Sequence, residues 1–330
     1  MLPLQSQLTR NTKDGLPLTR ESRLFGAVEA GGTKFVCAIG DESGKIHAET
    51  RFPTIDAGST LAAVSDFFDA QRRARGRFTA IGVACFGPLI LDKSSAKYGF
   101  IGNTPKAGWC DIDVAGVLAR EFMCAVGFDT DVNAAALAEQ RWGVAQDTRN
   151  LVYLTVGTGI GGGVLIDGTP LHGLQHPEIG HIRPRRHPLD VNFAGVCPFH
   201  GDCLEGLASG PAILARSGAD LAHLDAAHPQ WQMQADYLGQ LCAQLVLTLS
   251  PQRIIVGGGV MTQTRLFPVI RERMLHWLGG YIDRSELNAE SERYVVPPAL
   301  GPKAGVLGGL CLAIDAAIQP VLSKAPGSRS

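Results

Sequence analysis

Apolar runs separated by glycine-rich turns mark out two similar stretches of the chain. Residues 24–50, LFGAVEAGGTKFVCAIGDESGKIHAET, contain two apolar runs around a Gly-Gly-Thr-Lys turn and a third strand-like run after a polar turn. This pattern predicts a hairpin followed by a third strand. Residues 150–173, NLVYLTVGTGIGGGVLIDGTPLHG, repeat the same plan. One such unit in each half of the chain indicates an internally duplicated, two-domain fold.

Helical and strand-like patterns alternate through the rest of the chain. Apolar residues at helical spacing predict helices, and continuous apolar runs bounded by turn residues predict buried strands. The predicted helices cover residues 60–76, 133–143 and 233–250, and the predicted buried strands 78–89 and 251–261. Strands that alternate with helices indicate an α/β architecture with layered sheets.

Composition narrows the class of protein. The 330 residues are 45% hydrophobic, enough for a large core, and the net charge of −1 disfavours nucleic acid or an anionic membrane as partner. No run approaches the roughly 20 apolar residues of a membrane span. Residues 1–24 are polar and are expected to form a disordered extension without a signal peptide. Eight scattered cysteines argue against a disulfide framework, so we expect a reducing, cytoplasmic location.

The glycine turns invite comparison with phosphate-binding loops, because backbone N–H groups can approach phosphate closely where no Cβ intervenes. Residues 40–45, GDESGK, fail as a P-loop because one residue is missing between the glycines and Ile46 stands where Ser or Thr is required. Residues 157–162, GTGIGG, satisfy the dinucleotide pattern, but a strand-like run follows where that fold needs a helix. A dehydrogenase is therefore a poor alternative, and plain tight hairpins remain the other interpretation of each turn.

A metal site is predicted in residues 180–206, GHIRPRRHPLDVNFAGVCPFHGDCLEG. Cys197, His200 and Cys203 supply three zinc ligands in one compact turn. A zinc site needs a fourth ligand, and spacing alone does not choose between His176, His181 and His187. Four protein ligands leave no open position for water, so such a metal is structural. The alternative is a pair of free cysteines beside solvated histidines.

The series of motifs resembles the ROK family of sugar kinases, and within it the bacterial fructokinases. The resemblance runs from about residue 25 to about residue 318. It rests on GAVEAGGTKFVCAIG, GVACFGPL, NTPKAGW, DTDVNAAALAE, LTVGTGIGGGVL, HPEIGHIRPRRHP, CPFHGDCLEGLASGPAI and IIVGGGVM, in that order. It implies two ribonuclease-H-like domains of the actin and hexokinase type, with an interdomain cleft for nucleotide and sugar.

The resemblance also implies domain limits. We expect an N-terminal α/β domain over residues 25–130, completed by a C-terminal helix at about 304–320. A C-terminal α/β domain is expected over 131–303, with the zinc-binding loop at 176–206. Residues 321–330 are expected to form a tail.

Phosphoryl transfer needs an aligned acceptor, stabilised phosphate charge and a base for the acceptor hydroxyl. By resemblance Asp131 is the catalytic base, although Asp is also a good helix N-cap. Magnesium is expected to bridge the phosphates, and Glu29 stands where many relatives carry Asp. The residues implied to bind ATP are Gly31, Gly32, Thr33, Lys34, Thr158, Gly159, Gly161, Gly162, Gly257, Gly258 and Gly259.

The resemblance also selects the fourth zinc ligand and the sugar site. His181, the histidine of the Gly-His pair, joins Cys197, His200 and Cys203, and its second nitrogen faces the sugar. His200 replaces a cysteine that many ROK proteins carry. The residues implied to bind the sugar are Asn103, Asp131, Glu178, His181 and Glu205.

These implications favour an ATP-dependent fructokinase that forms fructose 6-phosphate and uses Mg2+ and a structural Zn2+. Thr130 supports fructose, because glucose-type relatives show Asn before the catalytic Asp. A broader hexokinase acting on mannose or glucose is the alternative, and a non-catalytic sugar-binding regulator a distant one. ROK repressors carry a helix-turn-helix, which about 24 polar residues are too few to fold. A homodimer is the family expectation.

Overall fold

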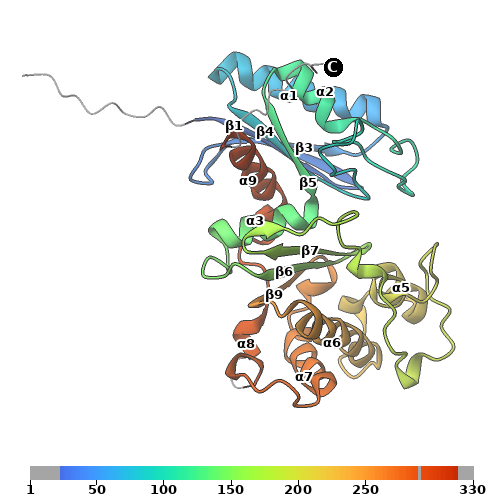
Figure 1. Cartoon of the computed structure of the whole chain (residues 1–330). Coiled ribbons are helices and arrows are strands. Elements are labelled where there is room, and N and C mark those ends of the chain that lie inside the picture. Colours follow the sequence, from blue (N-terminus) through green and yellow to red (C-terminus); the bar gives the residue numbers. More distant parts are fainter. Residues whose placement is uncertain (1–22, 289–290, 319–330) are drawn as a thin grey trace, which may run out of the picture.

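Two five-stranded mixed sheets, one above the other in Figure 1, form the framework of the computed structural model. The structure describes residues 23–288 and 291–318, so the predicted N-terminal extension, apart from residues 23–24, and the predicted tail lie outside the described residues. The first sheet has the strand order β3-β2-β1-β4-β5. Its strands are β1 (Phe25–Ala30), β2 (Lys34–Gly40), β3 (Ile46–Pro53), β4 (Ala80–Cys85) and β5 (Ala125–Thr130).

The second sheet repeats the first. Its order is β10-β9-β6-β7-β8, which is the order of the first sheet read from the opposite end. In both sheets three antiparallel strands are followed by two strands that run parallel to the first strand of the hairpin. The predicted duplication and α/β class are confirmed. The strands are β6 (Leu151–Val156), β7 (Ile160–Ile166), β8 (Thr169–Pro170), β9 (Arg253–Gly257) and β10 (Val295–Val296).

Each sheet is covered by helices on both faces. In β1, Val28 and Ala30 join one hydrophobic cluster while Phe25 and Ala27 join another, because alternate side chains point to opposite faces. Helices α1 (Ala57–Arg75) and α2 (Val114–Phe122) cover the first face, and α9 (Ala304–Ile318) covers the second (Figure 1).

Helices α3 (Asp131–Trp142) and α9 lie together between the two sheets (Figure 1). A Cβ at Gly308 would lie 2.4 Å from the backbone of Ala134, so the two helices touch almost backbone to backbone. Residues 301–318 are the one described stretch that is long and apolar enough to cross a membrane, but this stretch is a buried core helix here. The predicted domain limits stay predictions, and the packing of α9 on β1, β4 and β5 agrees with its predicted place in the N-terminal unit.

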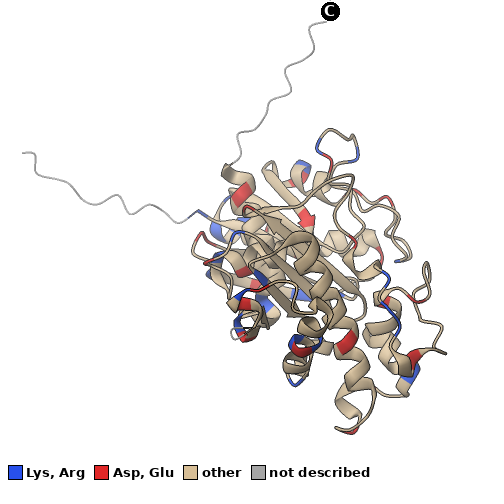
Figure 2. Ribbon diagram, turned by 60° about the horizontal axis from the view of Figure 1, so that its bottom comes forward, with Lys and Arg blue, Asp and Glu red and all other residues tan. Residues whose placement is uncertain are grey.

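The outer face of the second sheet is covered by the long helices α6 and α7, which pack against each other. Charged residues of both signs are interspersed over the ribbon, in keeping with the net charge of −1 (Figure 2). The helices of this half are α4 (Leu204–Ala208), α5 (Gly210–Ser217), α6 (Gln230–Leu249), α7 (Leu266–Leu278) and α8 (Ser291–Tyr294). The single-turn 3-10 helices are η1 (Ile179–His181), η2 (Pro188–Asp190), η3 (Leu221–His223), η4 (Val260–Thr262), η5 (Ser285–Leu287) and η6 (Gly301–Lys303).

Candidate active site

A cavity of about 650 Å³ lies where the two halves meet, and predicted residues from both halves line it. Glu29 and Lys34 come from the first hairpin, Asp131 from the start of α3, and Gly257–Gly259 from the end of β9 and the turn after it. The cavity therefore brings together the predicted base, the lysine of the first phosphate motif and the third glycine turn.

Asp131 is the first residue of α3, directly after β5. The helix is capped by Thr130, whose Oγ1 accepts a hydrogen bond from the Asn133 backbone N–H at 3.1 Å. The alternative role of Asp131 as the N-cap is therefore wrong. Its Oδ1 accepts from the Val132 N–H at 2.9 Å, and the carboxylate lines the cavity. Thr130 is buried, and its hydroxyl accepts the hydrogen bond that caps α3.

The surroundings of Asp131 tune it for proton transfer. Burial raises the pKa of this carboxyl to about 6, while the Val132 N–H lowers it and the nearby carboxylates of Glu29 and Glu178 raise it further. A carboxylate with a pKa near neutrality is well suited to general base catalysis. The influence of Glu178 also places that predicted sugar ligand near the base.

Glu29 and Lys34 both line the cavity from the first hairpin, where Glu29 is paired with Val36. Burial raises the pKa of Glu29, and the charge of Lys34 opposes that shift. A Cβ at Gly305 would lie 2.4 Å from Glu29 Cδ, so the carboxylate sits against the first turn of α9. Oxygen ligands of this kind suit Mg2+, and Glu29 with Asp131 are the described carboxylates in this cavity.

The turn between β1 and β2, Gly31–Thr33, is held from two sides. Thr54 Oγ1 donates to the Gly31 carbonyl at 2.7 Å, and Lys106 Nζ donates to the Gly32 carbonyl at 2.5 Å. The Gly31 N–H donates to the Lys34 carbonyl at 3.0 Å, whereas Gly32 and Thr33 are exposed, so their backbone N–H groups can reach a ligand. Sequence reasoning missed Lys106.

The second hairpin places its predicted residues in two environments. Thr158 lies in the turn and lines an adjoining cavity of about 360 Å³, which shares Gly259 with the first. Gly161 and Gly162 instead lie within β7, opposite Thr155 and Leu154, so they are not part of the turn. Their predicted contact with ATP stays a prediction.

Two further features fix the glycine turns of the second half. Glu205 Oε2 accepts from the Ile160 N–H at 2.9 Å, directly after Gly159. Gly258 has a φ of +94°, and a Cβ there would lie 2.4 Å from the Val156 carbonyl oxygen. A side chain is excluded at this point of the cavity wall.

Four residues of the predicted zinc loop come together. The ligand atoms of His181, Cys197, His200 and Cys203 all lie within 4.8 Å of one another. His181 Nδ1 is 3.5 Å from Cys203 Sγ and 3.8 Å from Cys197 Sγ, and Cys197 Sγ is 3.6 Å from His200 Nδ1. Tetrahedral zinc with ordinary Zn–N and Zn–S bonds needs ligand atoms about 3.4–3.8 Å apart. The donor set and its spacing fit zinc.

The other histidines considered as zinc ligands have different partners. His187 Nδ1 accepts from the Leu189 N–H at 3.2 Å, and His176 Nε2 accepts from the Leu89 N–H at 3.0 Å. Because His181 Nδ1 faces the cysteines, its Nε2 lies on the opposite edge of the ring. Asn103 lies exposed on the loop between β4 and α2, and its predicted sugar contact stays a prediction.

The segment that leads into the N-terminus of α9 also lines the main cavity. Sequence reasoning missed this segment. Pro297, Pro298 and Pro302 line the main cavity beside Gly301 and Gly305. The cluster of prolines and glycines in residues 297–305, PPALGPKAG, could have indicated a functional loop.

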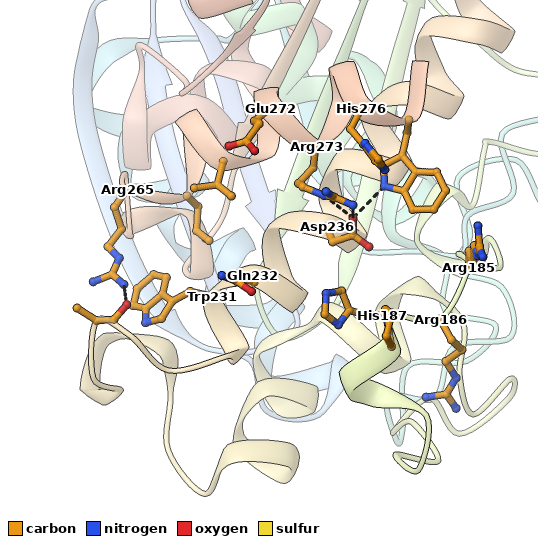
Figure 3. Close-up of a pocket in the computed structure, with 15 residues that line it drawn as sticks. Arg185, Arg186, His187, Trp231, Gln232, Asp236, Arg265, Glu272, Arg273 and His276 are labelled. Atoms are coloured by element: carbon orange, nitrogen blue, oxygen red, sulfur yellow. Dashed lines mark hydrogen bonds and ion pairs between the residues drawn. The ribbon is translucent and has the colours of Figure 1, made fainter. Parts of the chain in front are cut away.

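A separate cavity of about 790 Å³ lies between α6 and α7 and contains none of the predicted site residues (Figure 3). Two of its arginines have structural partners. Arg273 Nε donates to Asp236 at 2.7 Å, and Arg265 stacks on Trp231 with 3.5 Å from the guanidinium carbon to the ring centroid. We therefore place the chemistry in the cavity between the two sheets.

Comparison with known proteins identifies the family of this chain. Residues 25–316 match the model of the ROK family. The chain is 43% identical to a fructokinase of Zymomonas mobilis, covering 91% of this chain and 99% of that one. It is 42% identical to a fructokinase of Pediococcus pentosaceus, covering 88% and 97%.

A solved structure shares the fold. The ROK hexokinase of Thermus thermophilus superposes with a TM-score of 0.72 at 28% identity, covering 88% of this chain and 98% of that one. The two duplicated sheets, the cavity between them and the match over residues 25–316 lead to one conclusion. This chain belongs to the ROK family.

Proposed function

We propose that this protein is a fructokinase that transfers the γ-phosphoryl group of ATP to the 6-hydroxyl of D-fructose. The observation that carries the proposal is Asp131, a carboxylate with its pKa raised to about 6, in a cavity that also contains Lys34 and Gly257–Gly259. Fructokinases more than 40% identical over nearly their whole length support the choice of sugar.

Asp131 accepts the proton of the attacking hydroxyl as that oxygen bonds to the γ-phosphorus, while the bond from the γ-phosphorus to the β,γ-bridging oxygen breaks and ADP leaves. Lys34 and the backbone N–H groups of Gly32, Thr33, Thr158 and Gly159 offset the phosphate charge, while the N–H groups of Gly31 and Gly157 close their own turns. When bound, Mg2+ would neutralise charge on the phosphates, and Glu29 and Asp131 are the carboxylates of this cavity that would hold it. Catalysis by these residues consists of positioning, electrostatics and one proton transfer.

The zinc loop shapes the sugar site. His181, Cys197, His200 and Cys203 would hold Zn2+, which would cross-link residues 181–203 and take no part in catalysis. Glu178 and Glu205 flank this segment, and their carboxylates accept hydrogen bonds from sugar hydroxyls. Asn103 contributes a further sugar contact from the first half.

We further propose that the protein is a homodimer, which light scattering would establish.

The test measures ADP release with ATP and Mg2+ in the presence of fructose, glucose, mannose or an N-acetylated hexosamine. We expect the highest kcat/KM with fructose. Asp131→Asn should lower kcat by about 10²- to 10⁴-fold, since a general base contributes that much. Asp66→Asn, an exposed carboxylate on α1, serves as the control.

The alternatives give different results. Turnover mainly with mannose or glucose would support the same mechanism and would identify the protein as a hexokinase of broader specificity. Sugar binding in calorimetry without ADP release would indicate a non-catalytic regulator.

A further inference from the structure

His176 joins the two halves of the molecule next to the sugar site. It lies in the segment between β8 and η1, and its side chain is only 6% exposed. Nε2 accepts a hydrogen bond from the Leu89 backbone N–H at 3.0 Å, 87 residues away in the sequence. Nδ1 lies 3.5 Å from Glu178 Oε1. One buried ring thus contacts the first half through one nitrogen and a predicted sugar ligand through the other.

The hydrogen bond to Leu89 assigns the tautomer. A backbone N–H can only donate, so Nε2 must carry a lone pair, and the proton of the neutral ring is on Nδ1. That proton points toward Glu178. At 3.5 Å the contact is longer than a strong hydrogen bond, and it favours a Glu178 carboxylate oriented toward the ring.

The turn that His176 contacts leads to the other side of the sugar site. A Cβ at Gly87 would lie 3.2 Å from His176 Cε1, so the ring packs directly on the Gly87–Leu89 turn. The Pro88 carbonyl in this turn accepts from the Gly102 N–H at 2.7 Å, and Asn103 follows Gly102. The ring therefore links the base of the Asn103 loop to Glu178.

We propose that His176 is a positioning residue for the sugar, which sets the Glu178 carboxylate and the Asn103 loop at a fixed separation. This inference rests on the proposed function and goes beyond it, because it assigns a role to a residue that need not touch sugar, nucleotide or metal. Loss of the His176 side chain should raise KM for fructose and leave KM for ATP unchanged. A merely structural histidine would lower stability without that selectivity.

Two substitutions separate the two nitrogens. The amide nitrogen of Asn takes the place of Nδ1, so His176→Asn keeps a donor toward Glu178 and loses the acceptor for Leu89. The amide of Gln reaches the place of Nε2, so His176→Gln keeps the acceptor for Leu89 and loses the donor toward Glu178. The matched control is His47→Gln, a partly buried histidine whose Nε2 is 2.7 Å from Asp41 Oδ2, outside the cavity.

The measurement is KM for fructose and for ATP in each variant, with thermal unfolding to confirm folding. We expect His176→Gln to raise KM for fructose about tenfold, with KM for ATP within twofold of wild type. His176→Asn should lower the melting temperature and raise KM for fructose less than His176→Gln does. Adding Glu178→Gln to His176→Gln should cause less further loss than Glu178→Gln alone, because the two residues act as one unit.

Three outcomes contradict the inference, and one contradicts the proposed function instead. Unchanged KM for fructose in a folded His176→Gln, an equal rise in both KM values, or additive effects with Glu178→Gln would each overturn the positioning role. If His176→Gln does not fold, the same measurement is made on His176→Asn: a rise in KM for fructose alone supports the role, and an unchanged KM for fructose or an equal rise in both KM values overturns it. Wild-type protein that does not phosphorylate fructose would contradict the proposed function itself.

Discussion

The two halves share one strand plan but differ in the connection that leaves the third strand. In the first half, residues 54–56 connect β3 directly to α1. In the second half, residues 171–203 connect β8 to α4, and this segment contains His176, Glu178 and the four residues of the zinc cluster. The duplication gives each half a glycine hairpin, and the enlarged connection carries two of the proposed sugar ligands, Glu178 and His181. We therefore expect substrate choice to depend mainly on the second half.

Among the changes considered, loss of the zinc cluster in the enlarged connection should have the largest effect on KM for fructose. Cys203→Ser should release the metal and raise KM for fructose by about 10- to 100-fold, because the residues that orient a site depend on the ordered loop. Metal content by mass spectrometry and KM for both substrates are the measurements. Cys110→Ser, an exposed cysteine outside the cluster, is the control. A zinc-free Cys203→Ser with wild-type KM for fructose would contradict the role of the loop.

The pH dependence tests the carboxylate at the junction of the halves. Asp131 must be ionised to accept a proton, and its pKa is raised to about 6, so kcat/KM should fall about tenfold per pH unit below that pH. The residual activity of Asp131→Asn should lack this slope. A flat profile down to pH 4.5 in the wild type would contradict the assignment of the base.

Ionisation of the Asp131 carboxyl also lowers the stability of the folded protein. Because its pKa is higher in the folded protein than in an unfolded chain, its ionised form destabilises the fold, and this cost appears as the pH rises through about 6. Asp131→Asn should therefore melt at a higher temperature than wild type at pH 8, and the difference should shrink toward pH 5. Calorimetry at both pH values checks this.

The smallest effect is expected in the first hairpin. Lys106→Gln removes the bond to the Gly32 carbonyl and should raise KM for ATP by about two- to fivefold, since one partly exposed bond is lost. Lys97→Gln, which removes an exposed ion pair with Asp111, should leave KM for ATP unchanged. An unchanged KM for ATP in Lys106→Gln would mean that the turn holds its shape without this lysine.

Sequence reasoning worked where the pattern is local. The hairpins, the duplication and the position of Asp131 follow from apolar periodicity and from motifs within about 15 residues. It failed for Thr130, because either of two adjacent polar residues could cap α3. It also missed Lys106 and considered His176 only as a zinc ligand, because the partners of these two residues lie 74 and 87 residues away in the sequence. Such contacts depend on how the halves pack, which no local pattern encodes.

The position of α9 has a consequence for how the protein is made. The face of β1 that carries Phe25 and Ala27 is covered by residues 304–318 of α9. A ribosome must therefore synthesise the whole second half before this face of the first sheet can be buried. The sheet that is translated first is therefore the last to have both faces covered, and this apolar face stays exposed while synthesis continues.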